Sequence, residues 1–311
     1  MSTSSNKTGP PSSFAIWTAM ISVYVVWGST YLAIRFAIET IPPFLMAGIR
    51  FLIAGSILIL WRRLRGDSAP SLQQWRSAAI IGIFLLVGGN GGVVWSEQYV
   101  PSGVTALLVG SAPLWMVLLD ALRPGGRPTG WVSIAGLILG FIGIAILVGP
   151  TSPTHSSEKI DLIGASVLIL ASLFWSIGSL YSRQAVLPPS PLLGTGMEML
   201  TGGGGLFLLG VLTGELKELT ITGISAQSLT GFFYLIIFGS WIGFSAYTWL
   251  LRAAPTPWVS TYAYINPVVA VILGHLLAAE PLTPRILIAA AIVVGSVALT
   301  TVSQQGFFRS K

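Results

Sequence analysis

The chain has 311 residues, of which 53% are hydrophobic and only 8% are charged, and its formal net charge is +6. Because soluble domains carry about a quarter charged residues, this composition excludes a water-soluble globule and indicates an integral membrane protein. The basic residues lie in short connections between apolar runs, which excludes a nucleic-acid partner, and the absence of cysteine excludes disulfides and thiol catalysis.

Ten apolar runs of about 20 residues, the length of a membrane-spanning helix, follow a polar N-terminal segment. Residues 1–13 are rich in Ser and Pro, which predicts a disordered cytoplasmic tail, and residues 304–311 are expected to form a second short cytoplasmic tail. We predict an all-α integral membrane protein whose ten transmembrane helices lie near residues 14–34, 44–61, 74–95, 102–122, 130–149, 161–181, 192–212, 227–250, 258–278 and 285–303.

The chain repeats itself in two halves, residues 14–150 and 160–303, which hold five runs each. Matches of Trp, Arg and Pro recur between the halves in nearly one register. They are Trp27 with Trp175, Arg35 with Arg183, Pro43 with Pro191, Trp95 with Trp249, and Pro113 with Pro267. Because five is odd, the second half starts on the opposite side of the membrane. We therefore expect two inverted five-helix repeats, an arrangement that lets transporters alternate between two faces.

The Lys and Arg residues predict the orientation, since short cytoplasmic loops are enriched in them. With the N-terminus in the cytoplasm, most basic residues fall on the cytoplasmic side, and both termini are expected there. This cytoplasmic set includes Arg62, Arg63, Arg123, Arg127 and Arg252.

Two charged residues, Arg50 and Glu198, lie inside predicted spans at matched positions of the repeat. A charge in a spanning helix costs at least about 2.5–3.5 kcal/mol, so it usually faces protein or a water-filled cavity. One interpretation is a substrate or proton site. The favoured alternative is a structural charge that snorkels or pairs with a loop, because each residue lies only about 10 Å along its helix.

Several other residues are candidates for gates or hinges. Arg35 and Arg183 fall where helices leave the membrane, so they are either entrance residues that attract a carboxylate or snorkelling anchors. Residues 88–92, Gly-Gly-Asn-Gly-Gly, predict either a hinge that includes Gly91 or the close approach of another helix. Pro113 and Pro267 are expected to kink their helices near mid-membrane, either for packing or beside a pocket.

Aromatic and polar side chains in the spans are candidates for the wall of a substrate pocket. Rings combined with Ser, Asn and backbone polar groups suit a small molecule with apolar and polar parts, and ring faces attract an ammonium group. Packing explains any single aromatic residue, so the prediction rests on the cluster. The candidate substrate-binding residues are Tyr31, Asn90, Trp95, Tyr99, Ser111, Trp115, Trp175, Tyr247, Tyr262 and Asn266.

Catalytic motifs are missing, since the sequence has no H-E-x-x-H, G-x-S-x-G or P-loop pattern. We expect no enzyme activity, no metal and no cofactor. The hypothesis is a secondary transporter whose partners are a small-molecule substrate and the lipid bilayer. A membrane enzyme or subunit acting on lipid-linked substrates is the alternative, and a passive channel is disfavoured because no selectivity motif is present. Coupling to protons is left open, because no Asp or Glu lies at mid-pocket.

The sequence resembles the EamA family of the drug/metabolite transporter superfamily over nearly its whole length. The resemblance is carried by the segment 27–31 (Trp-Gly-Ser-Thr-Tyr), Pro43, Arg50 with Phe51, the segment 99–113, the segment 267–270 and the segment 279–283 (Ala-Glu-Pro-Leu-Thr). The first half lacks a Glu matching the one in this last segment. The resemblance implies a ten-helix carrier of the bacterial inner membrane that exports amino acids, including aromatic ones, or related metabolites by alternating access.

Overall fold

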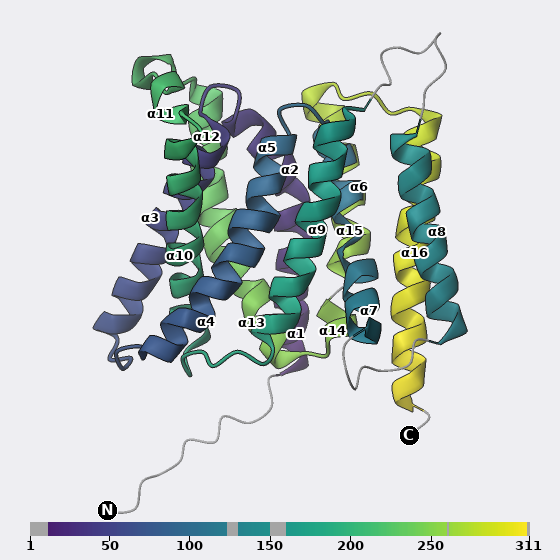
Figure 1. Ribbon diagram of the computed structural model, residues 1–311, viewed down its shortest axis with the longest axis horizontal. Coiled ribbons are helices and arrows are strands. Elements are labelled where there is room, and N and C mark those ends of the chain that lie inside the picture. Colours follow the sequence, from purple (N-terminus) through teal and green to yellow (C-terminus); the bar gives the residue numbers. More distant parts are fainter. Residues whose placement is uncertain (1–11, 123–129, 150–159, 260, 310–311) are drawn as a thin grey trace, which may run out of the picture.

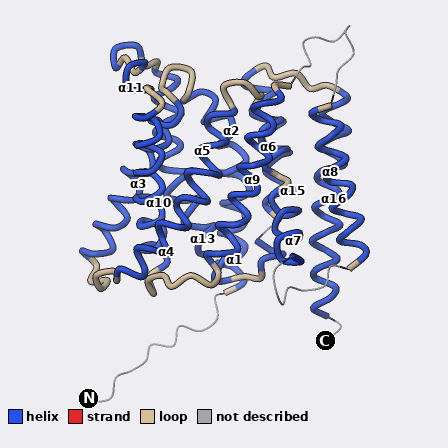
Figure 2. Tube along the Cα trace, viewed as in Figure 1, coloured by secondary structure: helices blue, strands red, loops and turns tan. Residues whose placement is uncertain are grey.

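The computed structural model describes residues 12–122, 130–149, 160–259 and 261–309, and within these ranges it contains helices and no strand (Figure 2). Residues 1–11, Arg123 and Arg127, which enter the predictions above, lie outside the described residues. Two shorter apolar helices, Ile265–Ala278 and Pro284–Thr300, accompany eight helices that are long and apolar enough to cross a membrane. These eight are Ser13–Ala37, Pro43–Leu64, Leu72–Ser96, Ser102–Leu122, Trp131–Val148, Leu162–Ser182, Pro191–Leu212 and Ala226–Ala253. The prediction of an all-helical, multi-pass membrane protein is confirmed.

Three spans contain a stretch of π-helix, in which the backbone hydrogen bond reaches one residue further than in an α-helix. In the first span η1 (Val23–Trp27) joins α1 (Ser13–Ser22) to α2 (Gly28–Ala37). In the third, η2 (Ile83–Asn90) joins α4 (Leu72–Gly82) to α5 (Gly91–Ser96). In the eighth, η5 (Leu235–Phe244) joins α12 (Ala226–Tyr234) to α13 (Ser245–Ala253). The glycine-rich segment 88–92 therefore sits where the helix changes from π to α.

The remaining helices are regular, with two departures from the predicted runs. The run near 102–122 is interrupted at Gly110 and Ser111, and Pro113 lies in the first turn that follows, where its missing N–H costs little. The last helix continues to Arg309, beyond the predicted end at residue 303. These helices are α3 (Pro43–Leu64), α6 (Ser102–Val109), α7 (Ala112–Leu122), α8 (Trp131–Val148), α9 (Leu162–Ser182), α10 (Pro191–Leu212), α11 (Glu215–Glu218), α14 (Thr256–Val259), α15 (Tyr262–Ala278) and α16 (Pro284–Arg309), with a 3₁₀ turn at Ile221–Gly223.

The long helices stand side by side and alternate in direction along the chain (Figure 1). Two helix pairs pack along most of their length, α3 with α10 and α8 with α16, and they lie on opposite sides of the bundle (Figure 1). We call the end that holds Glu215 and Glu280 the capped end. The opposite end, where α1 begins and α16 ends, is the terminal end.

The α3 and α10 helices approach closely because glycines line their contact. A Cβ atom at Gly48 would lie 2.6 Å from the backbone nitrogen of Phe207, and one at Gly55 would lie 2.7 Å from the carbonyl oxygen of Gly196. In lipid there is little hydrophobic drive between helices, so small residues that allow such contacts are what hold helices together.

Side-chain caps fix where several helices begin. Ser71 and Gln74 form a reciprocal capping box at the start of α4. The Asp161 carboxylate accepts a hydrogen bond of 2.6 Å from the Gly164 N–H at the start of α9, which satisfies a backbone donor that has no partner within the helix. Pro191 occupies the first position of α10, where its fixed backbone angle suits the helix.

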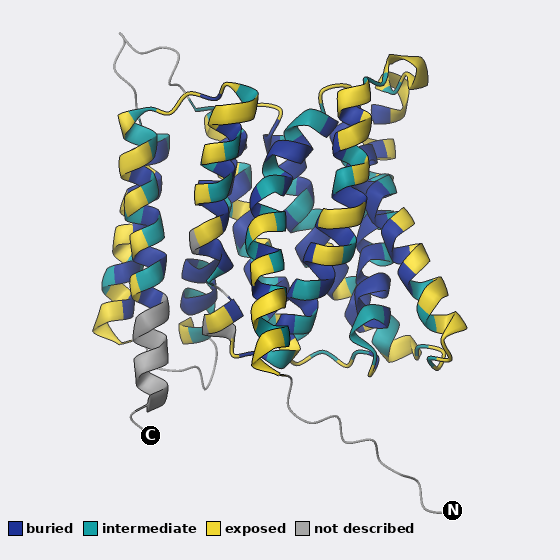
Figure 3. Cartoon of the chain, turned by 180° about the vertical axis from the view of Figure 1, so that it is seen from behind, coloured by how far each residue is buried: buried dark blue, intermediate teal, exposed yellow. Residues whose placement is uncertain are grey.

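Burial is distributed as expected for a protein in hydrocarbon. Large apolar side chains on the outward faces are exposed, among them Leu60, Ile163 and Leu276, whereas Phe51 and Leu168 are fully buried between the helices (Figure 3). A soluble protein would place polar residues on those outer faces. The buried core is thus confined to the interior of the bundle, where the cavity described next is found.

Candidate functional site

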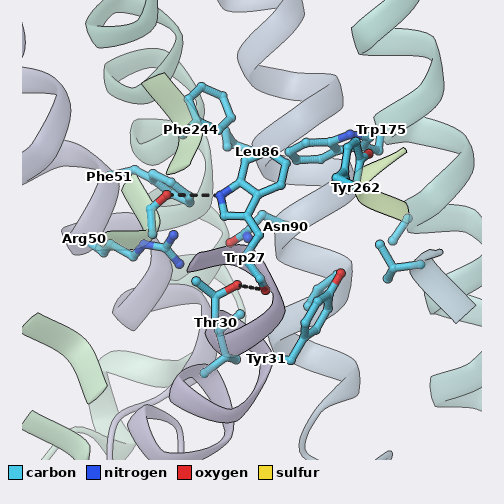
Figure 4. A pocket seen from close by; sticks show the side chains of 16 residues that line it. Trp27, Thr30, Tyr31, Arg50, Phe51, Leu86, Asn90, Trp175, Phe244 and Tyr262 are labelled. Atoms are coloured by element: carbon cyan, nitrogen blue, oxygen red, sulfur yellow. Dashed lines mark hydrogen bonds between the residues drawn. The ribbon is translucent and has the colours of Figure 1, made fainter. Parts of the chain in front are cut away.

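A cavity of about 60 Å³ lies inside the bundle (Figure 4). This space holds a few water molecules, so the walls must part before a metabolite can bind. The lining residues come from both halves of the chain and are Trp27, Thr30, Tyr31, Ile34, Arg50, Phe51, Leu86, Gly89, Asn90, Val93, Val109, Ala171, Trp175, Gly239, Phe244 and Tyr262.

All three π-helical segments contribute to this wall. Trp27 ends η1, Asn90 ends η2, and Gly239 and Phe244 belong to η5. π-Helical turns are rare and are found frequently at functional sites. Their concentration around one cavity marks it as the candidate functional site.

The aromatic side chains form one connected cluster around Trp27. The ring of Trp27 lies 5.4 Å from that of Trp175 in an edge-to-face arrangement, 4.9 Å from Tyr247 and 5.6 Å from Tyr262. Trp175 Nε1 donates a hydrogen bond to the Tyr247 hydroxyl at 3.2 Å, and this hydroxyl lies 2.7 Å from that of Ser179. The two tryptophans that match between the repeats therefore meet face to edge in the interior, in a geometry that aromatic pairs favour.

Polar atoms are few in the cavity, and two of them lack partners. Thr30 donates to the Trp27 carbonyl oxygen at 2.8 Å. Arg50 Nε donates to the Ser240 hydroxyl at 2.8 Å, but Arg50 Nη1 has no hydrogen-bond partner among the described residues. The Asn90 Oδ1 atom is likewise buried without one.

Four of the predicted substrate-binding residues line the cavity: Tyr31, Asn90, Trp175 and Tyr262. A fifth, Tyr247, is fully buried behind the wall and contacts the ring of Trp27.

The predicted residues nearest the helix ends lie away from the cavity. Trp95 and Tyr99 pack on one another at the capped end, with ring centroids 5.1 Å apart, and the Tyr99 side chain is exposed. Trp115 packs against Phe141 of α8 at 5.3 Å. None of these three residues lines the cavity.

Two predicted polar residues instead hold helices together. The Ser111 hydroxyl donates to the Leu108 carbonyl oxygen at 2.6 Å and lies 3.0 Å from the hydroxyl of Ser172. The Asn266 amide nitrogen, placed by exchanging the two amide atoms, donates to the Tyr24 carbonyl oxygen at 3.0 Å. Both residues are buried, and neither lines the cavity.

None of the predicted gate and hinge residues lines the cavity. Arg183 is exposed where α9 ends, at the terminal end, and Pro267 lies inside α15. Gly91 follows η2 directly, and a Cβ atom there would lie 2.8 Å from a methyl group of Leu206. The roles of these residues stay predictions.

At the capped end, the Glu280 carboxylate covers the beginning of α6. It accepts hydrogen bonds from the backbone N–H groups of Ser102 at 2.7 Å and Gly103 at 3.0 Å, and Arg35 Nε lies 3.7 Å from it. Helix N-termini carry partial positive charge and free donors, so a carboxylate there is stabilising. Arg35, which is part exposed, thus joins this end of the bundle rather than the cavity.

A second carboxylate does the same for α3. Glu215 accepts hydrogen bonds from the backbone N–H groups of Phe44 at 3.1 Å and Leu45 at 2.8 Å. The capped end therefore has two helices of the first half, α3 and α6, each held by an acid from the second half of the chain.

Glu97 lies beside this network but is not bonded into it. Its side chain is 2% exposed, and neither carboxylate oxygen has a hydrogen-bond partner among the described residues. Burial and the nearby negative charge of Glu280 raise the pKa of Glu97 well above its ordinary value, while Arg35 acts in the opposite direction. Glu97 therefore retains its proton to higher pH than an exposed glutamate.

The terminal end is joined by contacts of other kinds. The Thr195 and Thr248 hydroxyls lie 2.5 Å apart. Glu198 is buried, and one of its oxygens has no partner among the described residues, while Arg252 donates to the Pro188 carbonyl oxygen at 3.2 Å.

The lining residues that are not among the predicted substrate-binding residues include Trp27, Arg50, Phe51, Gly239 and Phe244. Trp27 carries a signal, because it recurs as Trp175, and Arg50 carries one as a charge inside a span. The interpretation of Arg50 as a charge that reaches an interface or a loop is wrong, since its side chain is 3% exposed and faces the cavity. The described residues include no cluster of three His, Asp or Glu side chains that could hold a metal ion.

Comparison with known proteins gives one family. Residues 13–149 and 162–302 each match the model of the EamA-like transporter family. The "Uncharacterized inner membrane transporter YedA" of Escherichia coli K12 is 36% identical over 296 residues, which cover 94% of this chain and 92% of that protein.

A more distant relative and a solved structure are also similar to this chain. The "WAT1-related protein At3g02690, chloroplastic" of Arabidopsis thaliana is 25% identical and covers 94% of this chain and 70% of its own. A solved structure described only as "Crystal structure of protein" superposes with a TM-score of 0.62 at 21% identity, covering 93% of this chain and 96% of that one. At that identity the likeness shows the fold alone.

Proposed function

The chain belongs to the EamA-like transporter family, and we propose that it is a secondary transporter that exports an amino acid or a related small metabolite across the bacterial inner membrane. The observation that carries this proposal is the cavity inside the bundle, which is lined by residues of both halves and walled by Trp27 and Trp175. A carrier needs a site between its two halves, because its substrate must be held while access changes sides.

We further propose that the fold is a ten-helix inverted repeat working by alternating access. The course of the chain supports this, since the first half begins at the terminal end and finishes at the capped end, while the second half runs the opposite way (Figure 1). The pairs α3 with α10 and α8 with α16 join matched helices of the two halves. Symmetry of this kind gives two equivalent ways to close one cavity.

The terminal end is proposed to face the cytoplasm. Arg62, Arg63, Arg76 and Arg252 lie there, whereas the capped end holds most of the acidic residues. Short cytoplasmic loops are enriched in Lys and Arg, so this bias supports cytoplasmic termini. Export then runs from the terminal end toward the capped end.

The substrate site is proposed to consist of Tyr31, Asn90, Trp175 and Tyr262, supported from behind by Tyr247. Arg35 and Arg183 mark the two entrances, and Gly91, Pro113 and Pro267 lie where helices bend during the exchange. The π-helical segments and the break at Gly110 support these hinge positions, because irregular backbone is tolerated in a membrane where it lines a cavity.

Purified protein in liposomes tests the function directly. Vesicles loaded with an unlabelled amino acid are expected to accumulate the same labelled amino acid by counterflow, for at least one member of a panel. Trp27→Ala should abolish this exchange by removing the centre of the aromatic cluster, while Trp131→Ala, which truncates an exposed ring, should leave it intact. Uptake no greater than that of protein-free vesicles across the whole panel would refute amino-acid transport.

A further inference from the structure

The cavity wall carries a buried guanidinium whose charge no neighbouring residue neutralises. The Arg50 side chain is 3% exposed. The ion pairs within the described residues are Arg35 with Glu280 and Arg62 with Asp67, so Arg50 has no carboxylate at ion-pair distance in the described part of the chain. Removing a charge from water without a partner is strongly unfavourable. The burial of an unpaired Arg50 guanidinium therefore needs an explanation.

The surroundings of Arg50 hold the guanidinium in one orientation. Ser240 accepts the hydrogen bond from Nε at 2.8 Å, and the ring of Phe51 lies 4.4 Å from the guanidinium carbon. Gly239 leaves room beside it, because a Cβ atom there would lie 2.8 Å from Nη2. The head group points into the cavity toward Trp27 (Figure 4), and its Nη1 nitrogen has no hydrogen-bond partner in the described part of the chain.

The same cavity offers a second polar atom of opposite character. The Oδ1 atom of Asn90 is a buried acceptor without a donor among the described residues. No acidic side chain belongs to the lining, and the remaining surface is largely aromatic and aliphatic. A ligand in this cavity therefore meets one fixed cation, one unused acceptor and apolar rings.

We propose that Arg50 binds the carboxylate of the transported molecule, while Asn90 accepts a hydrogen bond from its ammonium group, so that the substrate is an α-amino acid with an apolar side chain. This inference rests on the proposed transport function and specifies its substrate class. A guanidinium matches a carboxylate with two parallel hydrogen bonds, and the rings receive the apolar side chain.

The charge count distinguishes this class from doubly charged anions and from cationic amino acids. A phosphate monoester carries close to two negative charges at neutral pH, and the lining supplies one cation. A cationic amino acid would add a further side-chain charge to a wall that holds no acid to receive it. An apolar zwitterion pairs its carboxylate with Arg50, directs its ammonium group to Asn90 and to the ring faces, which attract cations, and fills the apolar surface.

The test compares acids with their uncharged amides. Proteoliposomes loaded with L-leucine or L-phenylalanine are assayed for counterflow inhibition by the same amino acid, by its carboxamide and by the corresponding 2-hydroxy acid. In the wild-type protein the carboxamide is expected to inhibit at least tenfold more weakly than the amino acid, and the hydroxy acid should fall between them. Arg50→Gln should lose the preference for acid over amide, and Asn90→Leu should lose the preference for amino acid over hydroxy acid.

Matched variants separate binding from folding. Arg76→Gln removes an exposed arginine elsewhere and should keep the wild-type preference. Arg50→Lys keeps the charge but not the paired geometry, and it should retain a weakened preference. Because Arg50→Gln removes an unpaired buried charge, its thermal unfolding temperature in detergent is expected to equal or exceed that of the wild type, whereas a purely structural arginine would lower it.

The outcomes also separate the two proposals. Transport of these amino acids with the same acid-over-amide preference in wild type and Arg50→Gln overturns the role of Arg50 and leaves the transporter standing. Absence of transport of every apolar amino acid by the wild type overturns this substrate class, and transport of another metabolite would then preserve the general function. If Arg50→Gln does not fold, direct binding to Arg50→Lys and Ser240→Ala decides the matter, since an unchanged acid-to-amide affinity ratio in both refutes the proposal.

Discussion

The two ends of the helix bundle are closed by different chemistry. At the capped end, the carboxylates of Glu280 and Glu215 each accept two hydrogen bonds from the backbone at the start of a helix. At the terminal end, a pair of threonine hydroxyls joins the helices, and the Glu198 carboxylate keeps one oxygen without a partner in the described part of the chain.

This difference predicts that the carboxylate caps hold the helices more firmly than the threonine pair does. Hydrogen bonds to a charged group contribute about 1.5–3 kcal/mol each, compared with about 1 kcal/mol for a neutral pair. We therefore expect the two carboxylate caps to resist opening more than the threonine pair does. A crevice between α1, α10 and α13, lined by Thr18, Pro191 and Trp249 among others, already lies at the terminal end.

Replacing Glu280 by Ala is expected to have the largest effect on this comparison. It leaves the N–H groups of Ser102 and Gly103 without acceptors, so the free energy of unfolding should fall by about 3–5 kcal/mol. The chain has no cysteine, so a single Val93→Cys substitution reports on the cavity through labelling by a membrane-impermeant maleimide. Labelling from the capped side should rise in the Glu280→Ala background.

Glu280→Gln and Glu218→Ala serve as controls for that experiment. The glutamine keeps one acceptor oxygen and should lose about half as much stability. Glu218 is exposed on the same side, so its replacement should change neither unfolding nor labelling. Equal labelling in all three backgrounds would mean that Glu280 does not hold the capped end closed.

Replacing Glu215 by Ala should have a smaller effect, with a loss of about 2 kcal/mol in the free energy of unfolding. Its two bonds cap α3, but α3 is also held along its length by α10, so the helix pair should persist. Denaturant unfolding in detergent measures the loss. A decrease as large as that for Glu280 would show that the two carboxylate caps are equivalent.

Glu97, at the capped end, should make the stability of the protein depend on pH. Its raised pKa means that the folded protein keeps a proton that the unfolded chain releases above about pH 4.5. Folding then takes up a proton, so stability should fall as pH rises between the ordinary and the raised pKa, by at most about 1.4 kcal/mol per pH unit. Thermal unfolding from pH 5 to pH 8 should show this slope, and Glu97→Gln should flatten it. An identical slope in both proteins would assign the effect to other groups.

The smallest effect is expected at the terminal end from Thr195→Val. This substitution preserves shape and removes one partner of a neutral hydrogen bond, and Thr248 retains its contact with the Ser245 carbonyl oxygen at 3.3 Å. The loss should be about 1 kcal/mol, measured by thermal unfolding. A loss equal to that of Glu280→Ala would remove the contrast between the two ends.

Much of the fold follows from hydrophobicity and length. A run of about 20 apolar residues has few alternatives to a spanning helix, which explains why the predicted run at 130–149 and the helix at Trp131–Val148 nearly coincide. The interruption at Gly110 and the extension of α16 to Arg309 do not follow, because both depend on what the neighbouring helices pack against.

The cavity was harder to predict, because its walls depend on which way each helix faces. Tyr31 and Trp175 line it, while Trp95 and Trp115 are equally aromatic and point elsewhere. A one-residue change of register turns a side chain by about 100°, and a π-helical turn makes such a change without a clear sequence signal. Arg50 shows the same limit, since distance along a helix does not reveal whether the side chain reaches inward.

The π-helical segments also have a consequence for how this protein tolerates changes in length. Each of η1, η2 and η5 holds its helix in a wider turn than an α-helix, and each borders the cavity. Deleting one residue from a regular spanning helix rotates everything beyond it, but a deletion inside η2 could be absorbed by tightening the wide turn to α. Chain length is thus a second variable, besides side-chain identity, by which the shape of this cavity can be altered while the helices keep their places in the bundle.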